Sequence, residues 1–83
     1  MGNLVVVVTG GSGGIGQAII KKYLQEGSFV ISADLENTTD FEDKNFSFLQ
    51  CNVECENSIN NLFEFVLKKY SRIDYFFSNA GIL

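Results

Sequence analysis

The chain has 83 residues, of which 46% are hydrophobic and 19% charged, so it can build one small apolar core but not two. Six basic residues against ten acidic ones give a net charge of -4, which argues against nucleic acid and against an anionic membrane surface as partners. Two cysteines and no histidine are too few for a disulfide framework or a four-ligand zinc site, so we expect no bound metal.

The first predicted element is a buried strand. Residues 4–8 read Leu-Val-Val-Val-Val, an apolar, mostly β-branched run that is typical of a strand covered on both faces, as in a parallel sheet. The run is too short for the apolar part of a signal peptide and far too short for a membrane span. We therefore expect a cytoplasmic protein with no membrane partner.

A glycine cluster follows this strand, and an amphipathic helix follows the cluster. From Gly14 to Glu26 apolar residues recur at helical spacing, while lysine, glutamine and glutamate take the remaining positions. Gly27 is placed to end the helix. The expected apolar stripe consists of Ile15, Ala18, Ile19, Tyr23 and Leu24.

Two more strands are predicted, with a polar segment between them. Residues 29–33 form a buried run that ends at Asp34, and residues 46–50 form the third strand. The segment 35–45 is polar and acidic, and we expect a loop or a single turn there.

A second helix and a fourth strand complete the predicted elements. The helix runs from Ser58 to Tyr70, and residues 73–77 form a short apolar strand. Strand, helix, strand, strand, helix, strand is an α/β pattern with right-handed crossovers. The expected apolar stripe of the second helix consists of Ile59, Leu62, Phe63, Val66, Leu67 and Tyr70.

The segment 9–16 between the first strand and the first helix contains five glycines. Glycines let a pyrophosphate approach the N–H groups of a helix N-terminus, whereas a turn without a ligand needs only one or two glycines. A nucleoside-triphosphate loop has the same glycine spacing, but Gln17 and Ala18 stand where it needs Lys and Ser or Thr. Asp34, at the end of the next strand, stands where a dinucleotide site has its ribose-binding acid. The pattern therefore favours a dinucleotide.

Two registers fit the glycines of the loop, and the loop alone does not separate them. The general G-x-G-x-x-G fingerprint fits at Gly11, Gly13 and Gly16. The second register has Thr9-Gly10 with Gly14-Ile15-Gly16, and three further landmarks follow it along the chain: Asn52-Val53, Arg72-Ile73-Asp74 before the fourth strand, and Ser78-Asn79-Ala80-Gly81. In this order the four landmarks resemble the T-G-x-x-x-G-I-G loop, the Asp-Val pair, the lead into the fourth strand and the N-N-A-G segment of the short-chain dehydrogenase/reductase family. The three distant landmarks favour the family's register.

The resemblance implies where a nicotinamide dinucleotide lies. Asp34 is expected to bind the adenosine ribose and to favour NAD over NADP, because a 2′-phosphate would bring like charge to its carboxylate. Asn52 replaces the family's Asp at the adenine but keeps a hydrogen-bonding side chain. The other implied contacts are Gly10, Ser12, Gly14, Ile15 and Gly16 at the pyrophosphate, Val53 at the adenine, and Asn79, Ala80 and Gly81 at the second ribose.

The resemblance also implies the fold and the activity. The expected fold class is α/β, a partial Rossmann-like doubly wound parallel sheet of strand order 3-2-1-4, truncated after the fourth strand. Residues 1–83 are interpreted as the N-terminal dinucleotide-binding half of a short-chain dehydrogenase/reductase domain. The expected function is NAD(H) binding within an oxidoreductase that transfers hydride between the cofactor and an alcohol or carbonyl substrate. A stand-alone nucleotide-binding or interaction module without catalysis is the alternative.

No catalytic residue is assigned in this chain. The family's Ser and Tyr-x-x-x-Lys lie beyond its N-A-G segment, and none of Tyr23, Tyr70 and Tyr75 is followed by Lys four positions later. We therefore expect the chain alone to turn over no substrate. We also expect the fourth strand to leave an apolar sheet edge that pairs with copies of itself. Cys51 and Cys55 are interpreted as one buried and one surface thiol.

Overall fold

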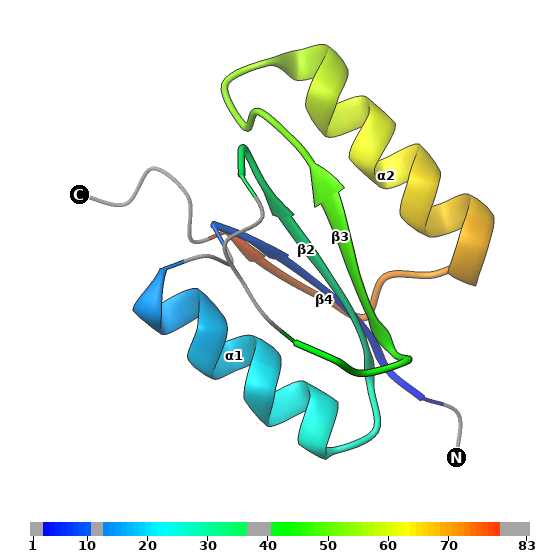
Figure 1. Cartoon of the computed structure of the whole chain (residues 1–83). Helices are drawn as coiled ribbons and strands as arrows, with labels where there is room; N and C mark the ends of the chain where they lie inside the picture. Colours follow the sequence, from blue (N-terminus) through cyan, green and yellow to red (C-terminus); the bar gives the residue numbers. More distant parts are fainter. Residues whose placement is uncertain (1–2, 11–12, 37–40, 79–83) are drawn as a thin grey trace.

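The computed structural model of the chain describes residues 3–10, 13–36 and 41–78 (Figure 1). The predicted types and order of the elements are confirmed over these residues, and their ends differ from the prediction by one or two positions. The elements are β1 (Val5–Thr9), α1 (Gly14–Gln25), β2 (Phe29–Asp34), β3 (Phe46–Gln50), α2 (Glu56–Tyr70) and β4 (Tyr75–Ser78).

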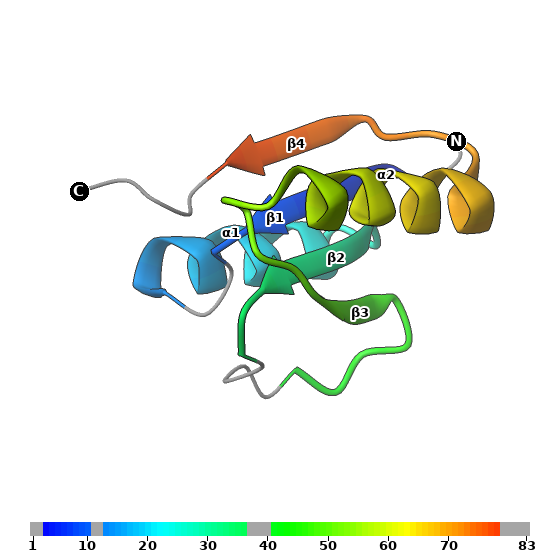
Figure 2. The same cartoon turned by 90° about the horizontal axis from the view of Figure 1, so that it is seen from above.

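The strands form one parallel sheet in the order β3-β2-β1-β4, as predicted. Val7 at the centre of β1 pairs with Ile31 of β2 and with Phe76 of β4. Figure 2 shows the strands side by side in this order with all arrows pointing the same way. Helix α1 covers one face and α2 covers the other, so the sheet is doubly wound (Figure 1).

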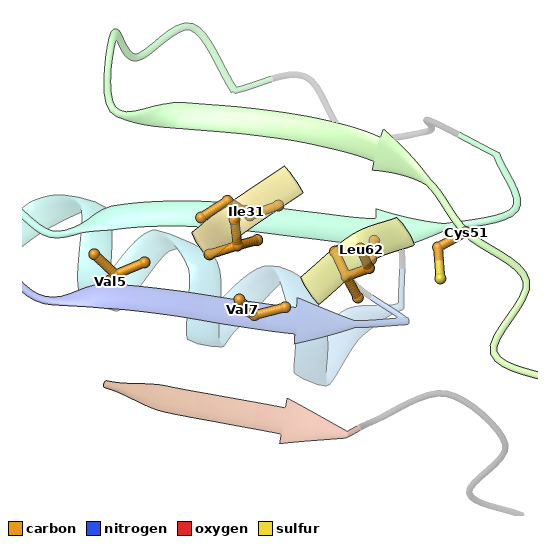
Figure 3. Close-up of a cluster of buried hydrophobic side chains, with 7 residues drawn as sticks. Val5, Val7, Ile31, Cys51 and Leu62 are labelled. Atoms are coloured by element: carbon orange, nitrogen blue, oxygen red, sulfur yellow. The ribbon is translucent and has the colours of Figure 1, made fainter. Parts of the chain in front are cut away.

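The unbroken apolar run of β1 is explained by the two helices. Val5 and Val7 face the α2 side, where they join Leu62 and Val66 (the α2-side cluster; Figure 3). Val6 and Val8 face the other way and pack with Ile20 of α1 (the α1-side cluster). Alternate side chains of a strand point to opposite faces, so a strand that is covered twice has no solvent-facing position for a polar residue.

Helix α1 faces the sheet through a different line of residues from the predicted stripe. Gly16 and Ile20 are its buried residues, and they lie one turn apart on the same side of the helix. Ile15 is 70% exposed and Ala18 is also exposed, so the prediction was wrong for these two residues. The buried line through Gly16 and Ile20 defines the rotation of α1 about its axis, and a glycine on such a line allows a helix to approach a sheet closely.

The centre of the predicted apolar stripe of α2 is buried as expected, but one residue at the edge of the stripe is not. Leu62 and Val66 are fully buried, whereas Leu67 is 47% exposed. Leu67 lies one turn beyond Phe63, whose ring stacks on Phe76 of β4. No described element lies beyond β4 to cover that side of the helix. Phe65, which was not predicted to be in the core, packs against the α2-side cluster.

The described parts of the connection between β2 and β3 contain no helix, in line with the expected loop or turn. Phe41 packs against the α1-side cluster, and its ring lies 5.3 Å from that of Phe46. The Oδ1 atom of Asp43 accepts a hydrogen bond from the N–H of Asn45 at 2.8 Å, which makes the turn into β3. Residues 37–40 of this segment lie outside the described residues.

Candidate functional site

The carboxyl ends of the parallel strands meet along one edge of the sheet (Figure 1). Two backbone hydrogen bonds join the segments that leave this edge. The N–H of Gly10 donates to the carbonyl of Ala33 at 3.0 Å, and the N–H of Cys51 donates to the carbonyl of Asp34 at 2.8 Å. Strand order changes direction between β1 and β4, and ligands of open α/β sheets bind at such a point.

The turn from β1 into α1 needs glycine at its first position. Gly10 has a φ of +69°, in the left-handed region that residues with a side chain rarely adopt. Its carbonyl accepts a hydrogen bond from the N–H of Gly13 at 3.3 Å, and the carbonyl of Gly13 accepts one from Gln17 at 2.9 Å. The chain therefore reverses tightly and begins α1 directly at the end of β1.

The N-terminus of α1 suits an anion. Gly13 occupies the N-cap position without a side-chain cap, and the first turn contains no acidic residue. A Cβ atom placed on Gly14 would meet no other atom within 4 Å, so the space beside this first turn is open. The N-terminal end of a helix carries about half a positive charge and free N–H groups. The residues that are present thus fit a bound phosphate group.

Asp34 lies at the rim of the site at the end of β2. Its side chain is half-buried, and its Oδ1 atom accepts a hydrogen bond from the N–H of Leu35 at 2.7 Å. The side-chain amide of Gln50, at the end of β3, donates to the carbonyl of Leu35 at 3.3 Å. These contacts hold the carboxylate at the carboxyl end of β2. Strand β2 is the neighbour of β1, from which the glycine turn leaves.

The turn after β3 carries Asn52 and Val53. The Oδ1 atom of Asn52 accepts a hydrogen bond from the N–H of Glu54 at 3.0 Å, and its carbonyl accepts one from Cys55 at 2.9 Å. An aspartate could make the same turn, and the amide oxygen of Asn52 has a second lone pair for an amino group. Val53 is half-buried and packs against the α2-side cluster.

The structure brings most of the predicted site residues to one edge of the sheet. Gly10, Gly14, Ile15 and Gly16 lie at the glycine turn and the start of α1, Asp34 follows in β2, and Asn52 and Val53 follow β3. Ser12 and Asn79, Ala80 and Gly81 lie outside the described residues.

Leu35 is a residue at this edge that the sequence pattern did not single out. Its side chain is 56% exposed beside Asp34, and Ile15 is 70% exposed beside the glycine turn. The signal available in the sequence was an apolar residue directly after the acid that ends β2.

The described residues provide neither a metal-binding cluster nor a membrane-spanning helix. Within the ranges 3–10, 13–36 and 41–78, no group of three or more His, Cys, Asp or Glu side chains is placed to hold a metal ion. Over the same ranges, neither helix is long and apolar enough to cross a membrane.

The fold and the family of the chain follow from this geometry and from comparison with known proteins. The parallel sheet, its strand order and its two covering helices define a Rossmann-type α/β fold. The family model described as short chain dehydrogenase matches residues 4–83. The chain therefore belongs to the short-chain dehydrogenase family, whose members bind nicotinamide dinucleotides.

Individual relatives match nearly the whole chain. Short-chain dehydrogenase reductase 3b of Arabidopsis thaliana is 31% identical, over 95% of this chain and 33% of the relative. (+)-Borneol dehydrogenase 1 of Salvia officinalis is 32% identical, over 95% of this chain and 32% of the relative. The chain thus spans only about a third of the length of these curated relatives and matches their N-terminal part.

Solved structures give the same result. A short chain dehydrogenase from Leptospira borgpetersenii with bound NAD+ has a TM-score of 0.87 and 28% identity, over 96% of this chain and 32% of that one. The ligand-free aldohexose dehydrogenase of Thermoplasma acidophilum has a TM-score of 0.86 and 31% identity, over 96% of this chain and 30% of that one.

Proposed function

We propose that this chain binds NAD(H) at the carboxyl edge of its sheet, as the N-terminal dinucleotide-binding half of a short-chain dehydrogenase domain. The observation that carries the proposal is the N-terminus of α1, which follows β1 directly, lacks a side-chain cap and has open space at the Cβ position of Gly14. In support, the similar dehydrogenase from Leptospira borgpetersenii holds bound NAD+.

The pyrophosphate lies at the glycine turn in this proposal. The left-handed conformation of Gly10 starts the turn, and Gly14, Ile15 and Gly16 present their N–H groups in the first turn of α1. Ser12 is assigned to the same phosphates, and Asn79, Ala80 and Gly81 are assigned to the second ribose. These assignments come from the family motifs of the sequence.

The adenosine lies over the ends of β2 and β3. Asp34 accepts the two ribose hydroxyls, while Asn52 and the N–H of Val53 hold the adenine. A 2′-phosphate within about 4 Å of the carboxylate would be disfavoured by roughly 4 kcal/mol per charge pair at an effective dielectric constant near 20. Solvent at this half-exposed edge screens part of that repulsion. The chain therefore prefers NAD to NADP.

The activity proposed for the whole protein is oxidoreduction of an alcohol or a carbonyl substrate. When bound, the nicotinamide group supplies or accepts the hydride. The residues assigned above bind and orient the cofactor, and none of them is given a proton-transfer role. A cytoplasmic location is part of the proposal and is supported by the small number of cysteines.

A second candidate function is an interaction module without catalysis. It is favoured by the edge strand β4, where Tyr75 is 46% and Phe76 is 38% exposed. Such an edge can pair with another strand, including that of a second copy of this chain.

Calorimetric titration of the chain with NAD and with NADP tests the main proposal. We expect NAD to bind and NADP to bind at least about tenfold more weakly, which corresponds to 1.4 kcal/mol. Asp34→Asn should reduce this ratio because it removes the negative charge, and Glu36→Gln, an exposed acid two residues further on, is the matched control. A chain that bound neither dinucleotide would overturn the proposed function, and equal affinities would overturn the role of Asp34.

A further inference from the structure

Two thiols flank the turn that carries the proposed adenine contacts. Cys51 directly follows β3, and Cys55 occupies the N-cap position of α2. Only three residues separate them, and Asn52 and Val53 are two of these. The proposed function uses neither sulfur atom.

The two thiols lie in different environments. Cys51 is 2% exposed and belongs to the α2-side cluster, in which Figure 3 shows it beside Leu62. Burial, and then the charge of the Cys55 thiolate, raise the pKa of Cys51. Cys55 is half-buried, and the backbone N–H and hydroxyl of Ser58 followed by the N–H of Asn57 lower its pKa. Cys55 is therefore the more reactive and more accessible of the two thiols.

The backbone folds back on itself between the two cysteines. The N–H of Cys55 donates to the carbonyl of Asn52 at 2.9 Å, which closes a four-residue turn whose ends lie within about 7 Å. Cys51 immediately precedes this turn, and its own N–H is bonded to the carbonyl of Asp34 at 2.8 Å. The turn directs the chain at Cys55 back towards Cys51, and the Cys55 thiolate is near enough to raise the pKa of the Cys51 thiol. A disulfide requires the two Cα atoms to come within roughly 4.4–6.8 Å of each other.

We propose that Cys51 and Cys55 form a redox-sensitive modification site, in which oxidation joins them by a disulfide across the Asn52–Val53 turn and weakens binding of the dinucleotide. The oxidant is hydrogen peroxide. The Cys55 thiolate attacks one peroxide oxygen and becomes a sulfenic acid as the O–O bond breaks. The Cys51 thiol then attacks the Cys55 sulfur, so that the S–S bond forms and the S–O bond breaks. Two electrons pass from the thiols to the peroxide, and both oxygen atoms leave as water.

The effect on binding rests on the proposed function and follows from the positions of the two sulfur atoms. To form the bond, Cys51 must turn out of the α2-side cluster or Cys55 must turn in from the start of α2. Either movement displaces Asn52 and Val53, which lie between them, and strains the hydrogen bond from Cys51 to Asp34. A dithiol reductant reverses the change because it reduces the disulfide.

Peroxide treatment of the full chain, followed by mass spectrometry, thiol titration and NAD calorimetry, tests the proposal. We expect each chain to lose two hydrogen atoms and both free thiols, NAD affinity to fall at least tenfold, and a dithiol reductant to restore both. Cys55→Ser is the matched control, because serine is a good N-cap residue and preserves the fold. It should bind NAD normally and show no loss of affinity with peroxide. Cys51→Ala should be equally insensitive.

Each result decides one part of the proposal. The absence of a disulfide within the chain, or a disulfide only between chains, would overturn the modification site whatever the NAD affinity. A disulfide that left NAD affinity unchanged, or a peroxide effect that persisted in Cys55→Ser, would overturn the link to binding. If the reduced chain bound no NAD, the proposed function would fail together with that link, while the mass measurement would still decide the disulfide.

Discussion

A substitution at Gly14 can distinguish an effect on ligand binding from an effect on folding. A Cβ atom at this position meets nothing within 4 Å, so a side chain projects into open space beside the first turn of α1 and not into the sheet. The proposed pyrophosphate occupies the same space. A larger side chain here should therefore affect the ligand and leave the protein core unchanged.

Gly14→Val should lower NAD affinity at least tenfold without lowering the free energy of unfolding. Valine is a better helix former than glycine by a few tenths of a kcal/mol, which favours the folded state slightly. Circular dichroism melts and calorimetry measure the two effects. The control is Ala18→Val, which adds the same side chain at an exposed position one turn further along α1. Normal NAD binding by Gly14→Val would contradict the placement of the pyrophosphate.

Asp74 joins the beginnings of two strands that lie far apart in the sequence. Its Oδ2 atom accepts a hydrogen bond from the N–H of Val5 at 2.7 Å, and its own N–H donates to the carbonyl of Val5 at 2.8 Å. The guanidinium group of Arg72 pairs with its Oδ1 atom. The hydrogen bond from Arg72, followed by that from Val5, lowers the pKa of the Asp74 carboxyl group.

This lowered pKa predicts a loss of stability in acid. A carboxyl group whose pKa is lower in the folded state contributes stability that is fully present above its unfolded pKa and is lost as the pH falls through the folded pKa. Asp74→Asn should therefore be less stable than the parent chain at neutral pH, and the difference should shrink below about pH 4, near the ordinary pKa of aspartate. Urea unfolding at both pH values measures it, with the exposed Glu42→Gln as control. A difference that did not depend on pH would contradict this role.

At the scale of the elements, each helix contributes to the core through the residues on one of its sides. Leu62 of α2 is fully buried in the α2-side cluster, whereas Leu67 of the same helix is 47% exposed. The two residues are chemically identical and differ only in which side of the helix they occupy. They therefore form a matched pair for measuring what burial against the sheet contributes.

Leu62→Ala should lower the free energy of unfolding by about 2–5 kcal/mol, because it removes buried methyl groups and leaves a cavity. Leu67→Ala should change it by only about 0.5 kcal/mol, as is usual for a surface substitution. Denaturant unfolding of both variants provides the measurement. Equal losses would mean that Leu67 is covered in solution, and the most direct explanation would be a partner at the β4 side of α2.

For the whole molecule, the feature to test is strand β4, which lies at one side of the described sheet. The rings of Tyr75 and Phe77 lie 5.8 and 5.6 Å from that of Tyr23 on the α1 side, and Phe76 stacks on Phe63 at 5.5 Å on the α2 side. Strand β4 pairs with β1, and it is an outer strand of the described sheet. It thus presents an apolar edge without a charged residue.

The chain should therefore self-associate in a concentration-dependent way through β4. Phe76→Lys should shift the population towards the monomer, because a lysine on an edge strand opposes pairing with another strand. Sedimentation velocity over a range of concentrations measures the effect, and Leu35→Lys, at an exposed apolar residue that follows β2, controls for a general gain in solubility. A parent chain that was monomeric at every concentration would contradict the prediction.

The sequence by itself determined the order of the elements and the parallel sheet, because these depend on local periodicity, and its motifs predicted where a ligand binds. An unbroken run of valines requires a strand covered on both faces, and a glycine-rich turn before a helix leaves room for an anion. The family resemblance added the strand order. The roles of Gly10, Asp34 and Asn52 in binding stay predictions, although the structure places these residues at one edge.

Only the tertiary structure decided which side of α1 faces the sheet, that Leu67 and Leu35 are exposed, and that Asp74 binds Val5. Helical spacing defines a stripe to within about one residue, but the rotation of a helix is set by close packing, here through Gly16 and Ile20. The contact between Asp74 and Val5 joins residues 69 positions apart, and no local pattern encodes the distance between them. Such pairings arise because the sheet places β4 beside β1, which is a property of the whole fold.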